Sequence, residues 1–497
     1  MAVADRHAGK SFPCPECGTS LKVPKPKQAA VAAKQRVQAT AATSSLDTPS
    51  APPRLPPSRI SRKAENRKSL DSTLQSLSGE FPRPRISLGY RLTALVVATG
   101  MLLLPLLYLA LIAAVGWATY WHASTNWYWV TQVRGRGVMI VGVFYLGGIL
   151  IGALWTLSML KPLFRNWGGT GKQEGLSRVK ERHLYEFADR IAQLVGSPKP
   201  DVISLSVDAN ASASFQTGMF GLERKQFCLT IGLPLLAGLT SAQLAGVIAH
   251  EFGHFSQARG MLLFRVILRI NNWFGEAIYQ RDWVDAVIEQ MGETEEWTIQ
   301  ILGFIAWCAV GIGRGVLWCL MIVGLALSGT LSRQMEYDAD QYECGLVGSD
   351  IYTRTSEQFM ELTVAYAIAS EFILTSHSAS YLPNNFPSFV AGLAEKSAKV
   401  KKKARKLIRD EPRSWFASHP VVRDRIAAAE RLDRPGIFHS KLAAKHLLKD
   451  YKKHAEGLTL LIYAVHFDGN VDTDSLRRTP EALEAYLATI GTSATGH

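Results

Sequence analysis

Long apolar stretches of the chain predict membrane-spanning helices. Residues 92–121 and 137–160 contain no charged side chain, and each exceeds the about 20 apolar residues that cross a hydrocarbon core. Tryptophan and tyrosine crowd the short connection between them, as they do at membrane–water interfaces. Residues 297–332 carry a single charge, Arg314, and form a third predicted span. The first two spans are expected to form a hairpin.

The charges that flank the first two spans predict their orientation. The first 90 residues are polar, with an excess of lysine and arginine and no signal peptide, and Lys161, Arg165 and Lys172 follow the second span. Because positive charge is retained on the cytoplasmic side, both flanks are expected in the cytoplasm. This pattern predicts a multi-pass protein of the cell (inner) membrane.

Helical periodicity resumes after the second span. Apolar residues recur at positions 244, 247, 248, 252 and 255, and Thr240 with Gln243 forms a capping-box pattern. The chain is therefore expected to form an amphipathic helix that begins near Ser241.

A metal-binding motif lies on this predicted helix, because residues 250–254 read His-Glu-Phe-Gly-His. Imidazoles at positions i and i+4 project from one helical face and can hold one zinc ion, so His250 and His254 are the candidate ligands. Glu251 can take a proton from a water held at the metal, which indicates metal-assisted hydrolysis. The alternative is a helix whose histidines lie on its polar face without binding metal.

A catalytic zinc site needs a third protein ligand and an open fourth position. The best candidate is Glu336, in a segment that can continue the third span as a single helix. Asp340 lies one turn later on the same face, where it can accept the free N–H of a ligating histidine. Taken alone, the pair would suit an ordinary solvated helical face.

These motifs together resemble the integral-membrane zinc metalloprotease family of HtpX and the CAAX prenyl proteases, with the HtpX-like branch favoured. The resemblance covers roughly residues 90 to 435. It rests on the 250–254 motif, on Ser-Arg-x-x-Glu-Tyr-x-Ala-Asp over 332–340, and on Ser-His-Pro over 418–420 followed by Arg425-Ile426.

The resemblance implies a mainly α-helical membrane protein, with transmembrane helices and a zincin-type α+β protease domain that holds a small β-sheet. It makes Glu336 the third zinc ligand and Asp340 its support. It makes His419 a stabiliser of the oxyanion, and from the residues alone either His419 or Asn210 could supply that donor, the alternative being that His419 merely starts a helix before Pro420. Residues 210–213 resemble the family's Asn-Ala-Phe-Ala segment at the edge strand that receives substrate, although the aromatic third residue is absent here.

Residues 260–280 decide the number of crossings. The metal helix and Glu336 must lie on one side of the membrane, so an even number of crossings is expected between them. This segment is apolar but carries Arg265, Arg269 and Glu276, which are costly in lipid. Four spans are the favoured interpretation, and an interfacial amphipathic helix is the alternative.

The N-terminal region offers a second candidate metal site. Cys14 and Cys17 form half of a zinc-ribbon knuckle, but no second CxxC completes it. Either a partner or second copy supplies the missing ligands, or the knuckle binds no metal. The net charge of +13 suits anionic lipid headgroups, and no nucleic acid is expected because no reader motif accompanies it.

The chain divides into seven predicted regions. These are a partial zinc knuckle (1–23), a disordered basic tether (24–88), a two-helix transmembrane hairpin (89–161), a protease segment with the metal helix (162–260), membrane or interfacial helices (261–332), a second protease segment with Glu336 (333–435) and a helical C-terminal region (436–497). Residues 201–207 and 226–231 are expected to form strands.

The leading interpretation is a zinc-dependent endopeptidase at the cytoplasmic face of the membrane. Its partners would be the bilayer and protein or peptide substrates, with misfolded or damaged membrane proteins implied by the HtpX-like resemblance. A homo-oligomer is compatible with these features. The alternatives are a non-catalytic receptor or scaffold that retains its zinc, and a prenyl-peptide processing protease, which usually has more spans.

Overall fold

The computed structural model describes residues 11–13, 20–22, 59–82, 84, 88–163, 175–217, 224–256, 260–281, 283–376, 382–414, 419–467, 469, 471 and 476–492. The two candidate zinc ligands Cys14 and Cys17 lie outside these residues. Strands β1 (Ser11–Pro13) and β2 (Ser20–Lys22) on either side of them pair antiparallel. A metal site between the strands stays a prediction.

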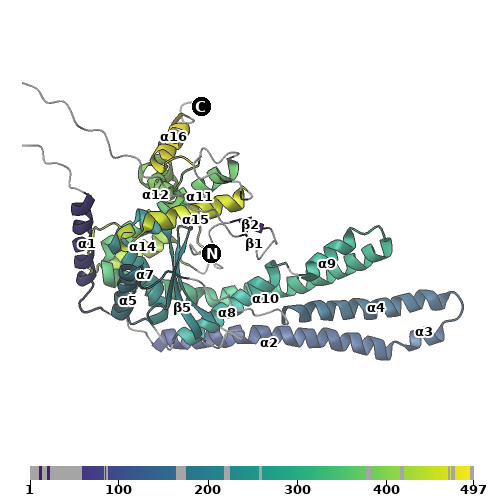
Figure 1. Ribbon diagram of the computed structural model, residues 1–497. Helices are drawn as coiled ribbons and strands as arrows, with labels where there is room; N and C mark the ends of the chain where they lie inside the picture. The colour runs from purple at the N-terminus through teal and green to yellow at the C-terminus, as the bar shows by residue number, and fades with distance from the viewer. Residues whose placement is uncertain are drawn as a thin grey trace, which may run out of the picture.

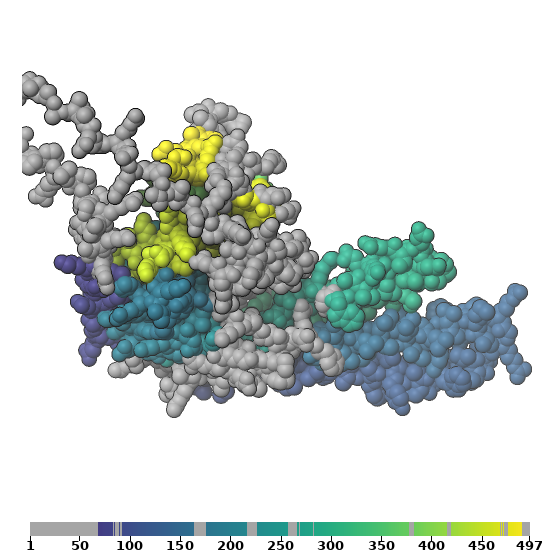
Figure 2. Space-filling model, viewed as in Figure 1, coloured from purple at the N-terminus to yellow at the C-terminus, as the bar shows by residue number. Residues whose placement is uncertain are grey.

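Long helices extend from one side of a compact protease region (Figures 1 and 2). Helices α2 (Leu88–Thr125) and α4 (Gly137–Leu160) form the predicted hairpin, joined by α3 (Tyr128–Gln132) and followed by the short helix η2 (Lys161–Leu163). Three helical segments of the described chain are long and apolar enough to cross a membrane: Leu92–Gln132, Gly137–Leu163 and Trp297–Val347. The three expected long spans are therefore present as helices.

Helix α8 (Gly260–Tyr279) is the expected fourth crossing, and it is not among the segments apolar enough to span. It nevertheless buries Ile267, Ile270 and Phe274 in a core shared with α2 and α10 (Trp297–Val347). Asn271 Nδ2 on its polar side donates to Ser328 Oγ at 3.2 Å. Helices α8 and α9 (Trp283–Gly292) lead away from the protease region and α10 returns to it (Figure 1). Four spans remain a prediction.

A three-stranded sheet forms one layer of the protease region. It contains β3 (Val202–Ser206), β5 (Arg224–Gly232) and β4 (Ala211–Thr217), in that order. Strand β5 pairs parallel with β3 and antiparallel with β4, so β4 is an edge strand. The two strands predicted near 201–207 and 226–231 are confirmed.

Helix α7 (Ser241–Ser256) follows the short helix α6 (Leu233–Gly238) and begins where the sequence predicted. Its capping box is formed, because the Thr240 N–H donates to Gln243 Oε1 at 2.9 Å and the Gln243 N–H donates to Thr240 Oγ1 at 3.3 Å. The apolar face of α7 packs on the sheet and on α5 (Arg182–Val195), with Ile248 and Phe252 fully buried. The metal motif is thus held rigidly against the sheet.

The remaining helices surround α7. Helix α10 runs without a break from the apolar stretch into the protease region, as the sequence predicted for the segment around Glu336. Helices α11 (Ser349–Thr375), α12 (Phe386–Lys396), α13 (Ala398–Asp410) and α14 (Val422–Leu432) follow it. Beyond them, η4 (Ala444–Leu447), α15 (Tyr451–His466) and α16 (Thr479–Thr492) confirm a helical C-terminal region and pack against α6, α7 and α12.

The structure corrects the expectation of a disordered tether for residues 59–76, while residues 24–58 of that predicted tether lie outside the described residues. Helix α1 (Arg59–Ser76) packs against α5 and η4 (Figure 1). Leu70, Leu74 and Leu77 are buried in the core of the protease region. Their helical spacing forms a narrow apolar stripe, which the polar average composition of the segment concealed.

We expect Leu74→Ala to destabilise the protein by about 2–5 kcal/mol, because it leaves a cavity under α1. Leu74 is only 3% exposed. Thermal unfolding of detergent-purified protein measures the loss, with the exposed Gln75→Ala on the same helix as control. Equal melting temperatures for both variants and the wild type would contradict the packed position of α1.

Candidate active site

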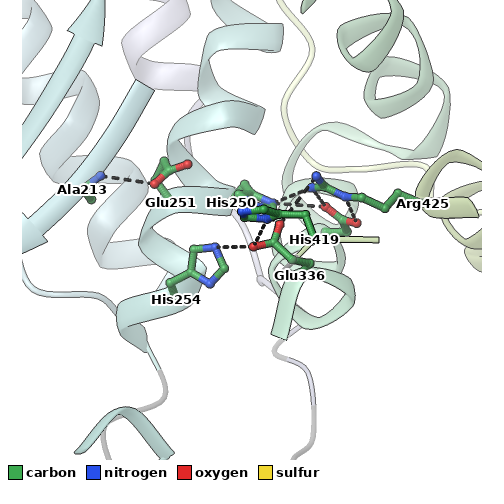
Figure 3. A network of polar contacts seen from close by, with 8 residues as sticks. Ala213, His250, Glu251, His254, Glu336, His419 and Arg425 are labelled. Carbon is green, nitrogen blue, oxygen red and sulfur yellow. Dashed lines mark hydrogen bonds and ion pairs between the residues drawn. The ribbon is translucent and has the colours of Figure 1, made fainter. Parts of the chain in front are cut away.

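Two helices bring three candidate metal ligands together. His250 and His254 project from α7, and Glu336 projects from α10 (Figure 3). His250 Nε2 lies 3.5 Å from Glu336 Oε2, and His254 Nε2 lies 3.8 Å from Glu336 Oε1. The three residues predicted from sequence as zinc ligands therefore share one site.

The donor set fits zinc. One ligand atom from each of the three side chains lies within 4.8 Å of the others. Two imidazole nitrogens and one carboxylate oxygen form a typical catalytic zinc set, which leaves a fourth position open. His254 Nδ1 is buried without a hydrogen-bond partner among the described residues, while its Nε2 faces the cluster.

Asp340 lies behind His250 and fixes the orientation of its ring. Asp340 Oδ1 is 3.1 Å from His250 Nδ1. A proton on Nδ1 is donated to this carboxylate, which leaves Nε2, the nitrogen that faces Glu336, as the one that would bind metal after losing its own proton. Asp340 therefore lies beside His250, and its support of metal binding stays a prediction.

Arg425, on α14, neutralises the buried carboxylates. Its guanidinium binds Asp340 with two hydrogen bonds, from Nη2 to Oδ1 at 2.5 Å and from Nε to Oδ2 at 2.9 Å. Its Nη1 also lies 3.5 Å from Glu336 Oε2. Paired, planar contacts of this kind fix geometry as well as charge. Sequence reasoning quoted Arg425 in a motif but gave it no role.

The electrostatics of the cluster favour the metal-binding form of two ligands. Burial opposes the charge of Glu336, but hydrogen bonds from His250 and His419 and the nearby Arg425 hold its pKa well below the usual range. Burial, followed by the charge of His250, lowers the pKa of His254 to about 4. Glu336 is therefore a carboxylate and His254 a neutral imidazole at neutral pH.

His250 carries the proton of the metal-free cluster. Burial disfavours its charged form, but hydrogen bonds to Asp340 and Glu336 outweigh this effect and raise its pKa to about 10. Because a ligating imidazole must be neutral at the bonding nitrogen, metal binding displaces this proton.

Glu251 lies beside the ligands, toward the sheet. The Ala213 N–H, on edge strand β4, donates to Glu251 Oε2 at 3.2 Å (Figure 3). The Asn210 carbonyl, just before β4, points toward β5 and accepts a hydrogen bond from the Gly232 N–H. Because the backbone groups of successive residues in a strand point to opposite sides, those of Ala213, three residues later, point away from β5. The backbone of Ala213 therefore faces the site. Burial raises the pKa of Glu251, which favours proton exchange closer to neutral pH.

The two candidate oxyanion stabilisers differ in position. His419 reaches the cluster, with Nδ1 2.8 Å from Glu336 Oε1 and its side chain 67% exposed. Asn210 is exposed, and its side-chain oxygen accepts the N–H of the neighbouring Ala211 at 2.9 Å. Within the described ranges no hydrogen bond joins Asn210 to the three ligands. Both oxyanion roles stay predictions.

Glu343 is a buried carboxyl that sequence reasoning missed. It is 5% exposed, seven residues after Glu336 on α10, and one of its oxygens lies within 4.8 Å of ligand atoms of His250 and Asp340. Burial raises its pKa to about 8, so it is largely neutral at pH 7. The spacing of Glu336, Asp340 and Glu343 along one helical face was the available signal.

Comparison with known proteins identifies the family. Residues 178–433 match peptidase family M48, and this range includes every residue of the site described above. The chain belongs to peptidase family M48. It is a metalloendopeptidase and a membrane protein, and zinc is the metal that M48 membership implies. The HtpX-like resemblance is confirmed.

Relatives named as HtpX proteases share the M48 region. The chain is 25% identical over 282 residues to a protein named Protease HtpX homolog from Gemmatimonas aurantiaca, covering 56% of this chain and 87% of that one. A Protease HtpX from Alkalilimnicola ehrlichii is 25% identical over 301 residues (58% and 84%), and one from Shewanella baltica is 26% identical over 219 residues (44% and 71%). No solved structure matches the chain.

We expect Asp340→Asn to weaken zinc binding by about 10- to 100-fold, because it removes the carboxylate that orients His250. Competition with a chelating dye measures the affinity of the purified M48 protein. Asp338→Asn, on the same helix but hydrogen-bonded to Gln334, is the matched control. Equal affinities for the two variants would show that Asp340 does not support the ligand.

Glu343 predicts a pH-dependent stability of the metal-free protein. Folding raises the pKa of the Glu343 carboxyl from about 4.3 in the unfolded chain to about 8. Its protonated form therefore stabilises the folded protein fully below about pH 4.3, and this stabilisation is lost as the pH rises through about 8. The melting temperature of wild type should therefore fall relative to Glu343→Gln between pH 5 and pH 8. Parallel profiles for the two proteins in chelator would contradict a protonated Glu343.

Proposed function

We propose that this protein hydrolyses peptide bonds at the cytoplasmic face of the cell (inner) membrane, with misfolded or damaged membrane proteins as substrates. The observation that carries the proposal is the placement of Glu251 between the three-ligand cluster and the exposed edge of β4. A site with only a structural role would have no use for a proton acceptor at this position.

His250, His254 and Glu336 would hold the zinc ion. When bound there, zinc supplies Lewis-acid polarisation of the scissile carbonyl and lowers the pKa of water. Asp340 and Arg425 keep the ligands in place, because they fix the ring of His250 and balance the charge of Glu336.

Glu251 moves the proton of the reaction. Its carboxylate takes a proton from the attacking water and delivers it to the leaving amide nitrogen, which balances the hydrolysis. The raised pKa of this buried carboxyl suits both halves of the transfer. The hydrogen bond from the Ala213 N–H holds Glu251 beside the edge strand before substrate enters.

Strand β4 would orient the substrate. An extended peptide can add to an exposed strand edge through main-chain hydrogen bonds, which requires no particular side chain. Ser212 and Ser214 are exposed along β4, whereas Ala213 is half-buried toward α7. A substrate strand here would lie next to Glu251. Such sequence-tolerant binding suits unfolded polypeptides.

The membrane placement rests on charge and on the direction of the helices. Basic residues flank the first two spans on the side that leads into the protease region, as in cytoplasmic loops. Helix α10 returns to that region from the apolar stretch (Figure 1). The active site would then face the cytoplasm, close to the bilayer.

Glu251→Gln is the decisive variant. We expect it to bind zinc as the wild type does and to lose at least about 100-fold of casein cleavage, because only the proton acceptor is removed. Metal content and cleavage are measured on detergent-purified protein. Glu371→Gln, on the exposed part of α11, should change neither quantity.

If Glu251→Gln retains its zinc and cleaves casein as fast as the wild type does, the mechanism is wrong. Absent cleavage in wild type would favour a non-catalytic receptor, once deletion of residues 1–58 has removed any inhibition by the segment before α1. Casein added to sealed membrane vesicles tests on which side of the membrane the active site lies. It should be cut by inside-out vesicles and spared by right-side-out vesicles.

A further inference from the structure

The C-terminal region contributes to a large cleft whose lining contains none of the three candidate metal ligands. Its volume is about 2310 Å³, and its lining includes residues of α11, α12, η4, α15 and α16. Small-molecule sites usually measure about 300–1,000 Å³. The space therefore suits a polypeptide segment.

Positive charge dominates the lining. Nine lysines and arginines face five aspartates and glutamates, together with two histidines. A concave surface lined mainly by one sign of charge concentrates its field and attracts the opposite charge. The cleft is thus suited to a ligand with net negative charge.

Three lysines in the C-terminal region supply charge that the chain does not neutralise. Lys441, Lys445 and Lys453 line the cleft and are exposed. None of them has a carboxylate within ion-pair distance in the part of the chain that the structure describes, whereas Lys452 pairs with Glu456 at 3.6 Å. These three side chains are available to an incoming carboxylate.

Hydrogen bonds join three lining residues of the cleft, one of which is on the metal helix α7. Gln243, on α7, donates to Gln358 Oε1 at 2.8 Å, and Gln358 donates to the Gly238 carbonyl at 2.6 Å. Gln243 precedes His250 by seven residues, which places it roughly 10 Å away along the helical axis. A ligand in the cleft and a peptide at the zinc site would contact the same rigid helix.

The chemistry of the lining favours a peptide over nucleic acid or lipid. Five acidic residues would repel a continuous polyphosphate, and Tyr451 is the only Phe, Tyr or Trp among the described lining residues, so a run of bases would find few large rings to stack on. Helices α15 and α16 lie on the side of the protease region opposite α2 (Figure 1). A mixed but net acidic peptide satisfies both signs of charge.

We propose that this cleft is an exosite that binds acidic segments of polypeptide substrates. The proposal rests on the proposed peptidase function, and it adds a substrate preference that the metal site itself does not supply. Binding at the exosite holds the substrate near the edge strand, so it lowers KM without changing the chemical step.

The first test measures binding without cleavage. A fluorescein-labelled, glutamate-rich peptide is titrated into the full-length, detergent-purified Glu251→Gln protein. Adding Lys441→Glu, Lys445→Glu and Lys453→Glu together should weaken binding about ten-fold or more, since charge complementarity is reversed. The control is Lys402→Glu, Lys403→Glu and Lys406→Glu on α13, which changes net charge equally outside the cleft lining and should alter affinity less than about two-fold.

Equal weakening by both triple variants would overturn the exosite, because the effect would then follow net charge alone. Absence of peptide binding at low salt would also overturn it. The alternative outcome is that a single-stranded oligonucleotide or phosphatidylglycerol vesicles displace the labelled peptide more strongly than unlabelled peptide does. If the cleft variant alone abolishes that competition, the cleft binds nucleic acid or lipid and the exosite proposal is wrong.

The second test separates the exosite from the catalytic proposal. Two peptides share one cleavable sequence, and one carries a glutamate-rich tail. In the otherwise wild-type protein, the cleft variant should raise KM about ten-fold for the tailed peptide and leave kcat unchanged, with both constants unchanged for the untailed peptide. A fall in kcat for both peptides would contradict the proposal. If no form cleaves either peptide, the proposed function fails, while the binding result still decides whether the cleft recognises acidic peptides.

Discussion

The close contact between α7 and α10 is the constraint on which the site depends. Gly246 and Gly253 face α10 from α7: a Cβ atom at Gly253 would lie 3.0 Å from the Tyr342 ring, and one at Gly246 would lie 2.8 Å from Glu343 Oε1. A Cβ atom at either position would force these side chains of α10 to shift, so glycine suits the close approach of the two helices. It brings Glu336 within reach of two histidines on another helix and places Asp340 behind one of them.

This contact buries carboxyl groups that need compensation. Glu336 and Asp340 share one guanidinium, that of Arg425, while Glu343 avoids the cost by remaining protonated near neutral pH. A buried charge without a partner would cost several kcal/mol, roughly. Helix α14, which carries Arg425, is therefore as necessary to the ligand geometry as the two helices that supply the ligands.

Local patterns predicted what local forces determine. The spacing of Leu244, Val247 and Ile248 placed α7, and the motif on it pointed to two candidate metal ligands, because side chains one turn apart on a helix meet regardless of the remaining fold. Arg425 and Glu343 gained their roles only from tertiary contacts, which no single stretch of sequence contains. Helix α1 was missed because its two buried leucines, Leu70 and Leu74, stand in a segment of polar average composition. The cleft was missed because its walls are far apart in sequence.

Helix α10 is a single element of 51 residues that includes an apolar stretch long enough to cross a membrane and the candidate metal ligand Glu336. Glu336 follows the last residue of the apolar stretch, Ser332, by four residues, or roughly 6 Å along the axis. The metal position is therefore tied mechanically to the bilayer. A change in membrane thickness that alters the tilt of α10 would move Glu336 relative to His250 and His254 on α7. The rate of hydrolysis would then depend on the thickness of the bilayer.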